Sequence, residues 1–396
     1  MKKEHVLVIK FATLVFIVYT GQAFTFTLIL PFLEYLGFDV MSQMLITALG
    51  AVITISGQFI VGFLCDKFKT DKKVFNIAIS IFALVNWLLY SINNNPWYLV
   101  VIWTTLLTAF FMITQGVLDS WIIESDKYCL ENYGLIRAFG ALGWAVGSYL
   151  TSIFYGKWGY PALGYSFAAF LVLILLISLF VPDAQKADTK EKLVLADVGK
   201  LISSRDFLVF TVVFLFINIV SWTDGLTTIL KISELGKILN LSSVEVNYYT
   251  TLKYSIQALC ELPLFFLGGW FVKKFGAIKI VVFATIMLSL RFVLYAISVT
   301  PQQLVWASTL QMLTFPLIMI CTKILIDKAS PENLKTSGQL TSAAIYGGVS
   351  SLATPILCGW LGGLFSNNFV LYGAAVLCAV PVALLVIFGK DEKAEN

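Results

Sequence analysis

The sequence predicts an all-α integral membrane protein with twelve membrane-spanning helices. Of its 396 residues, 59% are hydrophobic and only 13% are charged, and the mean hydropathy is +0.86. Soluble domains are about 45–50% apolar and about 25% charged, so this chain carries more apolar surface than a water-soluble fold can hide. The apolar residues also recur in runs of about 20, the length that a helix needs to cross a bilayer.

Twelve apolar segments reach this length, and the longest polar stretch divides them six and six. The first segment is longer than the apolar core of a signal peptide, and we expect it to remain as a span. The division predicts an N-terminal six-helix bundle over 1–181, a cytoplasmic linker over 182–206 and a C-terminal six-helix bundle over 207–396. The predicted spans are 8–33, 42–65, 74–92, 97–123, 134–156, 161–181, 207–231, 246–271, 279–298, 303–326, 338–362 and 367–388.

Lysine and arginine are strongly biased to one side of these spans. In the predicted loops, the opposite side holds only Lys157, Lys231 and Lys237. Because loops rich in Lys and Arg stay in the cytoplasm, the bias predicts that both termini are cytoplasmic. We therefore expect a monomeric, multi-pass protein of the cell membrane.

Several classes of function are disfavoured by what the sequence lacks. The six cysteines are scattered without a C-x-x-C pair, and the one histidine, His5, lies in the N-terminal tail. This predicts no disulfide framework and no metal site. There is no G-x-x-x-x-G-K-[ST] phosphate loop, so ATP is not the expected energy source. We expect neither an enzyme nor a nucleic-acid-binding protein.

A motif after the second span is repeated after the eighth, at an offset of 207 residues. The first copy runs from Gly62 through Asp66 and Lys67, and the second is GWFVKKFG over 269–276. The pattern resembles the loop signature of the major facilitator superfamily, G-x-x-x-D-[RK]-x-G-x-[RK]-[RK], although Lys69 stands where glycine is usual. The resemblance implies two pseudo-symmetric six-helix bundles and a charge latch of Asp66 and Lys67 that gates the cytoplasmic side. Ordinary topology charge with a helix cap is the alternative.

An acid and a base lie close together in the fourth and fifth spans. Charged side chains inside a span cost about 2.5–3.5 kcal/mol each on insertion scales, so they are functional candidates by default. A short loop joins the spans of Asp119 and Arg137, and Gln115 lies one turn before Asp119. Arg137 and Trp144 share a helix face, and a guanidinium beside an indole suits a polar, ring-shaped solute. A structural ion pair, with Trp144 as packing, is the equal alternative.

The stretch YGLIRAFGALGWA over 133–145 resembles the fifth-helix motif of lactose permease and the oligosaccharide:proton symporters. The resemblance implies that Asp119 and Arg137 bind solute hydroxyls and that Trp144 stacks on a sugar ring, although aspartate replaces glutamate here. Gly140, Gly143 and Gly147 on the same helix are expected to let a neighbouring helix approach closely.

The eighth span carries Lys253, Gln257 and Glu261 on one face, at i, i+4 and i+8. Pro263 follows, and a proline in a membrane helix frees carbonyl groups that can face a cavity. The region resembles the wider sugar and nucleoside symporter branch. Glu261 is the favoured proton-coupling residue, with Lys253 in the same set and Gln257 as a solute ligand. The alternative is a structural partnership of Glu261 with Arg291 or Lys253.

The ninth and tenth spans resemble lactose permease but depart from it at two positions. Arg291 resembles its helix 9 arginine, whereas Gln311 and Thr314 stand where its coupling His and Glu would fall. Its proton relay therefore cannot be copied, and Gln311 is expected to bind solute instead. Asp224, in the seventh span, is a further coupling candidate that pairs with Lys323 or Arg291 or is protonated.

Together these residues predict a secondary active transporter that imports an oligosaccharide, glycoside or nucleoside by proton symport. The two bundles would alternate access around Asp119, Arg137, Trp144, Glu261 and Arg291. No cofactor is expected, because the proton gradient supplies the energy. A proton-coupled exporter of drugs or metabolites and an uncoupled facilitator are the alternatives.

Overall fold

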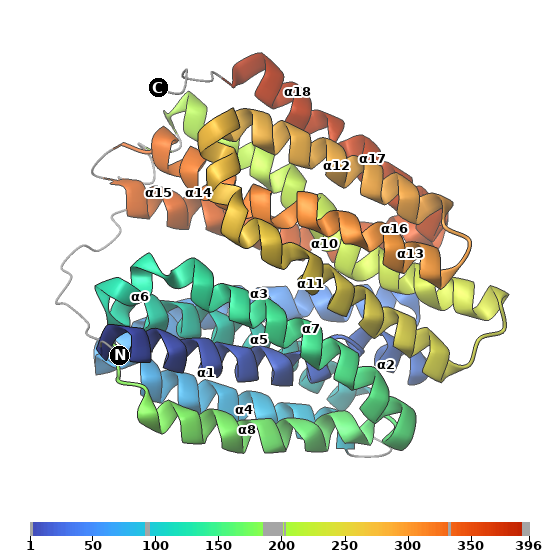
Figure 1. Ribbon diagram of the computed structural model, residues 1–396. Coiled ribbons are helices and arrows are strands. Elements are labelled where there is room, and N and C mark those ends of the chain that lie inside the picture. Colours follow the sequence, from blue (N-terminus) through green and yellow to red (C-terminus); the bar gives the residue numbers. More distant parts are fainter. Residues whose placement is uncertain (1–2, 92–95, 185–200, 202, 332–333, 390–396) are drawn as a thin grey trace. The chain divides into compact units, whose positions relative to one another are not determined.

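The computed structural model describes residues 3–91, 96–184, 201, 203–331 and 334–389, and every regular element among them is a helix (Figure 1). The chain divides into two compact units, which we describe separately. Unit 1 is Met1–Asp188 with Gly236–Leu259, and unit 2 is Thr189–Leu235 with Cys260–Asn396. The predicted linker over 182–206 lies largely outside the described residues, so the predicted bundle limits remain predictions.

Eleven helices of the described residues are long and apolar enough to cross a membrane. They correspond to every predicted span except 134–156. That segment is helical, as α7 (Tyr133–Trp158), but five glycines and several hydroxyl side chains lower its hydropathy. The chain is thus a multi-pass membrane protein, whereas the count of twelve spans and the cytoplasmic termini remain predictions.

Unit 1 is organised around two closely packed helices, α1 and α7 (Figure 1). The glycines of α7 explain the approach, because a Cβ on Gly143 would lie 2.3 Å from the carbonyl oxygen of Phe16, and one on Gly147 would lie 2.3 Å from that of Thr20. α1 also packs on α8, and α5 packs on α3 and α4. The helices of unit 1 are α1 (Lys3–Phe26), α2 (Ile29–Tyr35), α3 (Val40–Phe68), α4 (Asp71–Ser91), α5 (Trp97–Ser125), α6 (Lys127–Glu131), α7 and α8 (Pro161–Phe180).

The basic residues of unit 1 gather where α4 begins and α8 ends. The ammonium groups of Lys10 and Lys72 donate to the carbonyl oxygens of Phe180 and Val181, at 2.9 and 2.8 Å. Asp183 accepts hydrogen bonds from the Thr70 hydroxyl and the Lys72 amide, so a carboxylate caps the first turn of α4. Lys10, Lys72 and Asp183 thus join segments far apart in sequence at one end of the unit.

The internal repeat is visible in the backbone. Lys69 ends α3 in the left-handed conformation, with φ 51° and ψ 40°. Gly276, its counterpart in the second copy, also has a positive φ, 86°. Glycine is usual at this position because it adopts positive φ without a steric penalty. Lys69 thus keeps the turn geometry at some cost in free energy.

Unit 2 contains a membrane segment that changes helix type halfway. α13 (Pro301–Ala307) passes into a 3₁₀ turn, η1 (Ser308–Leu313), before α14 (Phe315–Ala329) begins. Pro316 has no N–H to donate and disfavours the α conformation in the residue before it, so the regular ladder stops here. The helices of unit 2 also include most of α10 (Arg205–Ile238), the second half of α11 (Ser243–Phe275), α12 (Ala277–Ile297), α15 (Lys335–Ala343), the π-helical η3 (Ala344–Gly348), α16 (Val349–Leu364), α17 (Asn367–Leu377) and α18 (Ala379–Phe388).

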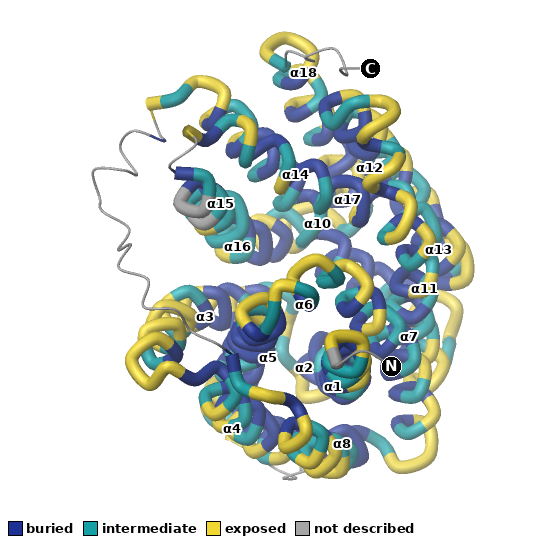
Figure 2. The backbone as a smooth tube through the Cα atoms, turned by 60° about the vertical axis from the view of Figure 1, so that its left-hand side comes forward, coloured by how far each residue is buried: buried dark blue, intermediate teal, exposed yellow. Residues whose placement is uncertain are grey.

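Both units leave apolar side chains on their outer faces. Figure 2 shows helices that are buried along one side and exposed along the other. Phe59, Phe180 and Val386 are about 70% exposed, at 72%, 69% and 69%. Large exposed apolar side chains of this number are expected where the surrounding solvent is lipid.

Candidate functional site

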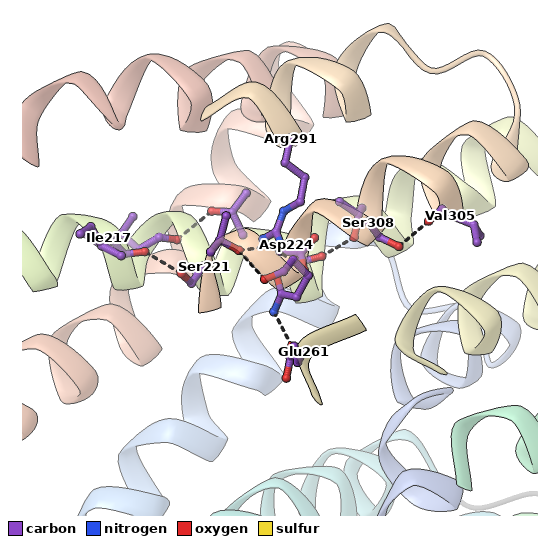
Figure 3. A network of polar contacts seen from close by, with 12 residues as sticks. Ile217, Ser221, Asp224, Glu261, Arg291, Val305 and Ser308 are labelled. Atoms are coloured by element: carbon purple, nitrogen blue, oxygen red, sulfur yellow. Dashed lines mark hydrogen bonds and ion pairs between the residues drawn. The ribbon is translucent and has the colours of Figure 1, made fainter. Parts of the chain in front are cut away.

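A buried ion pair lies at the centre of unit 2. Arg291 on α12 reaches toward Asp224 on α10, and one guanidinium nitrogen lies 3.9 Å from a carboxylate oxygen (Figure 3). Arg291 is 2% exposed and Asp224 is 7% exposed. Of the partners that the sequence left open for Asp224, the structure therefore shows Arg291.

A hydrogen-bonded chain continues from this pair to Glu261. The second terminal nitrogen of Arg291 donates to the Thr314 hydroxyl at 3.3 Å, and that hydroxyl donates to the carbonyl oxygen of Gln311 at 3.0 Å. The side-chain amide of Gln311 in turn donates to Glu261 Oε1 at 2.9 Å. Asp224, Arg291, Thr314, Gln311 and Glu261 thus form one polar network, which we call the unit 2 network.

The change of helix type brings two of these residues into the network. In a 3₁₀ turn, side chains three residues apart lie on the same side, so Gln311 and Thr314 both face Arg291 and Glu261. The Thr314 amide also donates to the Gln311 carbonyl, at 3.0 Å, which fixes the backbone of the turn. In an α-helix the same two side chains would be about 60° apart around the axis, because that helix has 3.6 residues per turn, so the 3₁₀ turn aligns them more closely.

A cavity of about 320 Å³ adjoins the unit 2 network, with Asn218, Trp222, Asp224, Arg291, Gln311 and Thr314 among its lining residues. Among the buried atoms of the network, Arg291 Nε and Gln311 Oε1 have no hydrogen-bond partner among the described residues. Buried polar atoms are normally satisfied. The network therefore holds an unsatisfied donor and an unsatisfied acceptor beside the cavity, which Trp222 also lines.

Unit 1 contains a second cluster, around Arg137. Its guanidinium lies 3.8 Å from an Asp119 carboxylate oxygen, and both side chains are partly exposed, at 25% and 30%. Arg137 also donates to the Tyr19 hydroxyl, and its guanidinium carbon lies 4.8 Å from the centroid of the Tyr19 ring. The side chain of Tyr133 hydrogen-bonds Asp119 from the first turn of α7. The structure thus brings together the acid and the base that the sequence paired.

One turn further along α1, an amide cluster connects α1 to α5. Gln22 is fully buried and donates to the Thr114 hydroxyl at 2.8 Å. Gln115 donates to the Gln22 side-chain oxygen at 3.3 Å. Gln115 is therefore linked to α1, while Asp119, one turn later on α5, is linked to α7.

Trp144 lies within a group of aromatic rings. Its ring centroid is 5.8 Å from that of Phe111 and 6.5 Å from that of Phe26, while Phe26 and Phe111 stack at 4.1 Å. Tyr254, from the part of α11 that belongs to unit 1, approaches edge-on at 6.4 Å. The geometry suits both of the roles considered for Trp144, packing and an apolar platform.

The remaining predicted residues occupy distinct places. Lys253 and Gln257 are buried, and the Lys253 ammonium lies 4.8 Å from the Tyr254 ring centroid. Asp66 lines a second cavity, between α3 and α5, of about 350 Å³. Lys67 is exposed and its ammonium lies over Phe63 and Phe68.

Three features escaped the sequence reasoning. Thr314, noted only as a departure from a known motif, connects Arg291 to Gln311. Tyr19 on α1 is an Arg137 partner that the sequence did not predict. Glu34 and Lys237, both in unit 1, form an ion pair of 2.6 Å. For Thr314, the sequence signal was Pro316, two residues later. The Tyr19–Arg137 and Glu34–Lys237 contacts join helices that are distant in sequence, and no sequence pattern indicated them.

Comparisons with known proteins agree with this architecture. The model of the MFS_1 like family matches residues 8–372. The uncharacterized transporter YwbF of Bacillus subtilis (strain 168) is 21% identical over 341 residues, 85% of this chain and 80% of that protein. The maltose permease of Geobacillus stearothermophilus is 22% identical over 354 residues, 88% of this chain and 86% of that protein. The crystal structure of the nucleoside transporter NupG superposes with a TM-score of 0.80 at 18% identity, covering 97% of this chain and 100% of that one.

Proposed function

The chain belongs to the major facilitator superfamily, and from this premise we propose that it imports a small polar solute by proton symport across the cell membrane. The solute class that we propose is a nucleoside, glycoside or oligosaccharide. The unit 2 network, beside a cavity of about 320 Å³, is the observation that carries the proposal. A nucleoside transporter and a maltose permease among the similar proteins support the same solute class.

The polar groups of unit 2 suit a solute that is rich in hydroxyls or carbonyls. Arg291 Nε supplies a donor and Gln311 Oε1 an acceptor, and neither has a hydrogen-bond partner among the described residues. Trp222 supplies an apolar ring at the cavity wall. A lipophilic cation would leave the donor unsatisfied, which costs free energy in a buried site. The chemistry therefore favours a polar solute over a lipophilic drug.

We propose that Glu261 carries the coupling proton. Asp224 is paired with Arg291 at 3.9 Å, and Glu261 accepts a hydrogen bond from the Gln311 side-chain amide, a group that can also pair with a protonated carboxyl. Protonation of Glu261 would remove a net charge from the network without breaking the Asp224–Arg291 pair. A carrier has to change conformation both with and without bound solute. The change of charge at Glu261 can make the loaded carrier differ from the empty one in that step.

In unit 1, we propose that Arg137 and Asp119 bind solute hydroxyls and that Trp144 stacks on the solute ring. The guanidinium of Arg137 has several N–H groups, so it can contact Asp119 and Tyr19 and still donate a hydrogen bond to a solute. We also propose that Asp66 and Lys67 act in a cytoplasmic latch, and that the two six-helix halves alternate access as a monomer.

Uptake into proteoliposomes tests the function. Vesicles with an inward proton gradient would be given radiolabelled uridine, adenosine or maltose, with and without a protonophore. The proposal predicts that one of these solutes accumulates above its external concentration and that the protonophore abolishes the accumulation. Equilibration without accumulation would indicate a facilitator, and gradient-driven extrusion of a lipophilic cation would indicate an exporter.

A further inference from the structure

Gln311 holds an amide between a proton-binding carboxylate and the cavity. Its Nε2 donates to Glu261 Oε1 at 2.9 Å, and the residue also lines the cavity. With Nε2 committed to Glu261, Oε1 is the remaining polar atom of the amide, and it is buried with no hydrogen-bond partner among the described residues. The amide thus holds an unpartnered acceptor beside the cavity while its N–H group donates to the Glu261 carboxylate.

A protonated Glu261 requires the opposite arrangement. An ionised carboxylate only accepts hydrogen bonds, whereas a carboxylic acid has an O–H to donate, and the amide oxygen is a good acceptor for it. The terminal torsion of glutamine is broad and roughly two-fold, so the amide can turn over without moving the backbone. The backbone carbonyl oxygen of Gln311 accepts hydrogen bonds from the backbone N–H and the hydroxyl of Thr314, each at 3.0 Å. The backbone is therefore held in place, and only the side-chain amide turns over.

We propose that Gln311 is a switch that reports the protonation state of Glu261 to the solute. When Glu261 binds a proton, the amide turns, Oε1 accepts from the carboxylic acid and Nε2 faces the cavity as a donor. When the proton leaves, the amide turns back and the cavity faces an acceptor again. This inference rests on the proposed role of Glu261 in proton coupling.

The switch identifies the kind of solute atom that can be coupled to the proton. A hydroxyl both donates and accepts, so it pairs with the amide in either orientation. A carbonyl oxygen, or a ring nitrogen that carries no hydrogen, only accepts, so it is bound in the protonated state and faces another acceptor in the ionised state. A solute with an acceptor-only group, such as a nucleobase, is therefore the class whose affinity follows the proton, whereas a plain oligosaccharide is not.

The other charged groups near the amide are few. Three helices pack against η1: α12 contributes Arg291, which donates to Thr314, α13 contributes no charged residue, and the charged residues of α14 begin only at Lys323. Cys260 and Lys253 share α11 with Glu261, and Asp224 faces the cavity from α10 paired with Arg291. Between Ser308 and Ile320 there is no titratable side chain. Glu261 is therefore the titratable group that touches the Gln311 amide directly among the hydrogen bonds of the described residues.

The first measurement needs no solute. Infrared difference spectra would be recorded for the full-length protein in lipid nanodiscs, between acidic and alkaline pH. The C=O stretching band of protonated Glu261 is assigned by comparison with Glu261→Gln, in which this band is missing. The switch predicts that this band appears together with a change in a glutamine side-chain band, and that Gln311→Leu moves the carboxylic acid band and removes the glutamine change. Gln302→Leu, the same substitution on α13, is the matched control and should leave both bands unchanged.

The second measurement is the affinity for uridine as a function of pH, with maltose as the hydroxyl-rich comparison. The native protein should bind uridine about tenfold more tightly at acidic than at alkaline pH, the factor expected for one exchanged hydrogen bond. Glu261→Gln, which can donate to Gln311 Oε1, should bind tightly at both pH values. Gln311→Leu should bind weakly at both.

The results separate the switch from the function that it serves. A Glu261 band that Gln311→Leu leaves in place would overturn the switch, even if uridine is transported. Uridine affinity that depends equally on pH in the native protein and in Gln311→Leu would also overturn it. A band that moves as predicted, in a protein that transports none of the test solutes, would support the switch and contradict the proposed solute class.

Discussion

Replacing Asp224 by asparagine is expected to destabilise the protein because it leaves the Arg291 charge buried without its counter-ion. Two unit charges 3.9 Å apart attract by about 4 kcal/mol at an effective dielectric constant of about 20. Measured losses on breaking buried pairs are similar, about 3–5 kcal/mol. Both residues are less than a tenth exposed, so solvent screens this pair weakly.

The double variant distinguishes this explanation from a general loss of packing. Asp224→Asn and Arg291→Gln should each lower the free energy of unfolding by about 3–5 kcal/mol. The double variant should lose less free energy of unfolding than either single variant, because it leaves no buried charge without a partner. Unfolding of the purified protein in mixed detergent micelles, followed by tryptophan fluorescence, measures all three.

Asp39→Asn is the matched control for the Asp224 substitution. Asp39 is exposed at the N-cap of α3, where asparagine is an equally good cap, so the change should stay within about 0.5 kcal/mol. Single variants of Asp224 and Arg291 that lie as close to the native protein as this control would refute the reasoning. A double variant as unstable as the two single losses combined would refute it too.

Three further predictions concern unit 1. Gly143→Ala should destabilise the protein by about 1–3 kcal/mol, because the added Cβ would lie 2.3 Å from the carbonyl oxygen of Phe16. Gly134→Ala is the control, since the space around Gly134 is open, and it should leave the free energy of unfolding unchanged in the same assay. Lys69→Gly should raise the free energy of unfolding by about 1 kcal/mol by relieving the left-handed conformation, and no change would show that the turn is unstrained. In solute uptake, Arg137→Ala should abolish transport while Trp144→Phe keeps partial affinity, and full transport by Arg137→Ala would remove Arg137 from the site.

Helix faces could be predicted from the sequence because spacing alone determines them. Lys253, Gln257 and Glu261 were placed on one face of a helix, and all three are buried. The glycines of α7 were expected to admit a close neighbour, and α1 is that neighbour. Both conclusions need only the helical period and the size of the side chains.

Partnerships between helices were harder, because they depend on which distant residues meet. Spacing could not decide between Lys323 and Arg291 as the partner of Asp224, and it gave no link between Gln311 and Glu261, which lie 50 residues apart. The 3₁₀ turn at Ser308–Leu313 aims Gln311 and Thr314 inward, and the sequence signal for it, Pro316, is equally compatible with a simple kink.

Coupled flux measurements on Glu261→Gln test the central claim most directly. Proteoliposomes that contain the native protein should take up protons together with the solute, and they should accumulate the solute under an inward proton gradient. The Glu261→Gln variant should lose both while still exchanging labelled for unlabelled solute at equilibrium, because only the proton step is removed. Proton-driven accumulation by Glu261→Gln at the native level would contradict the account.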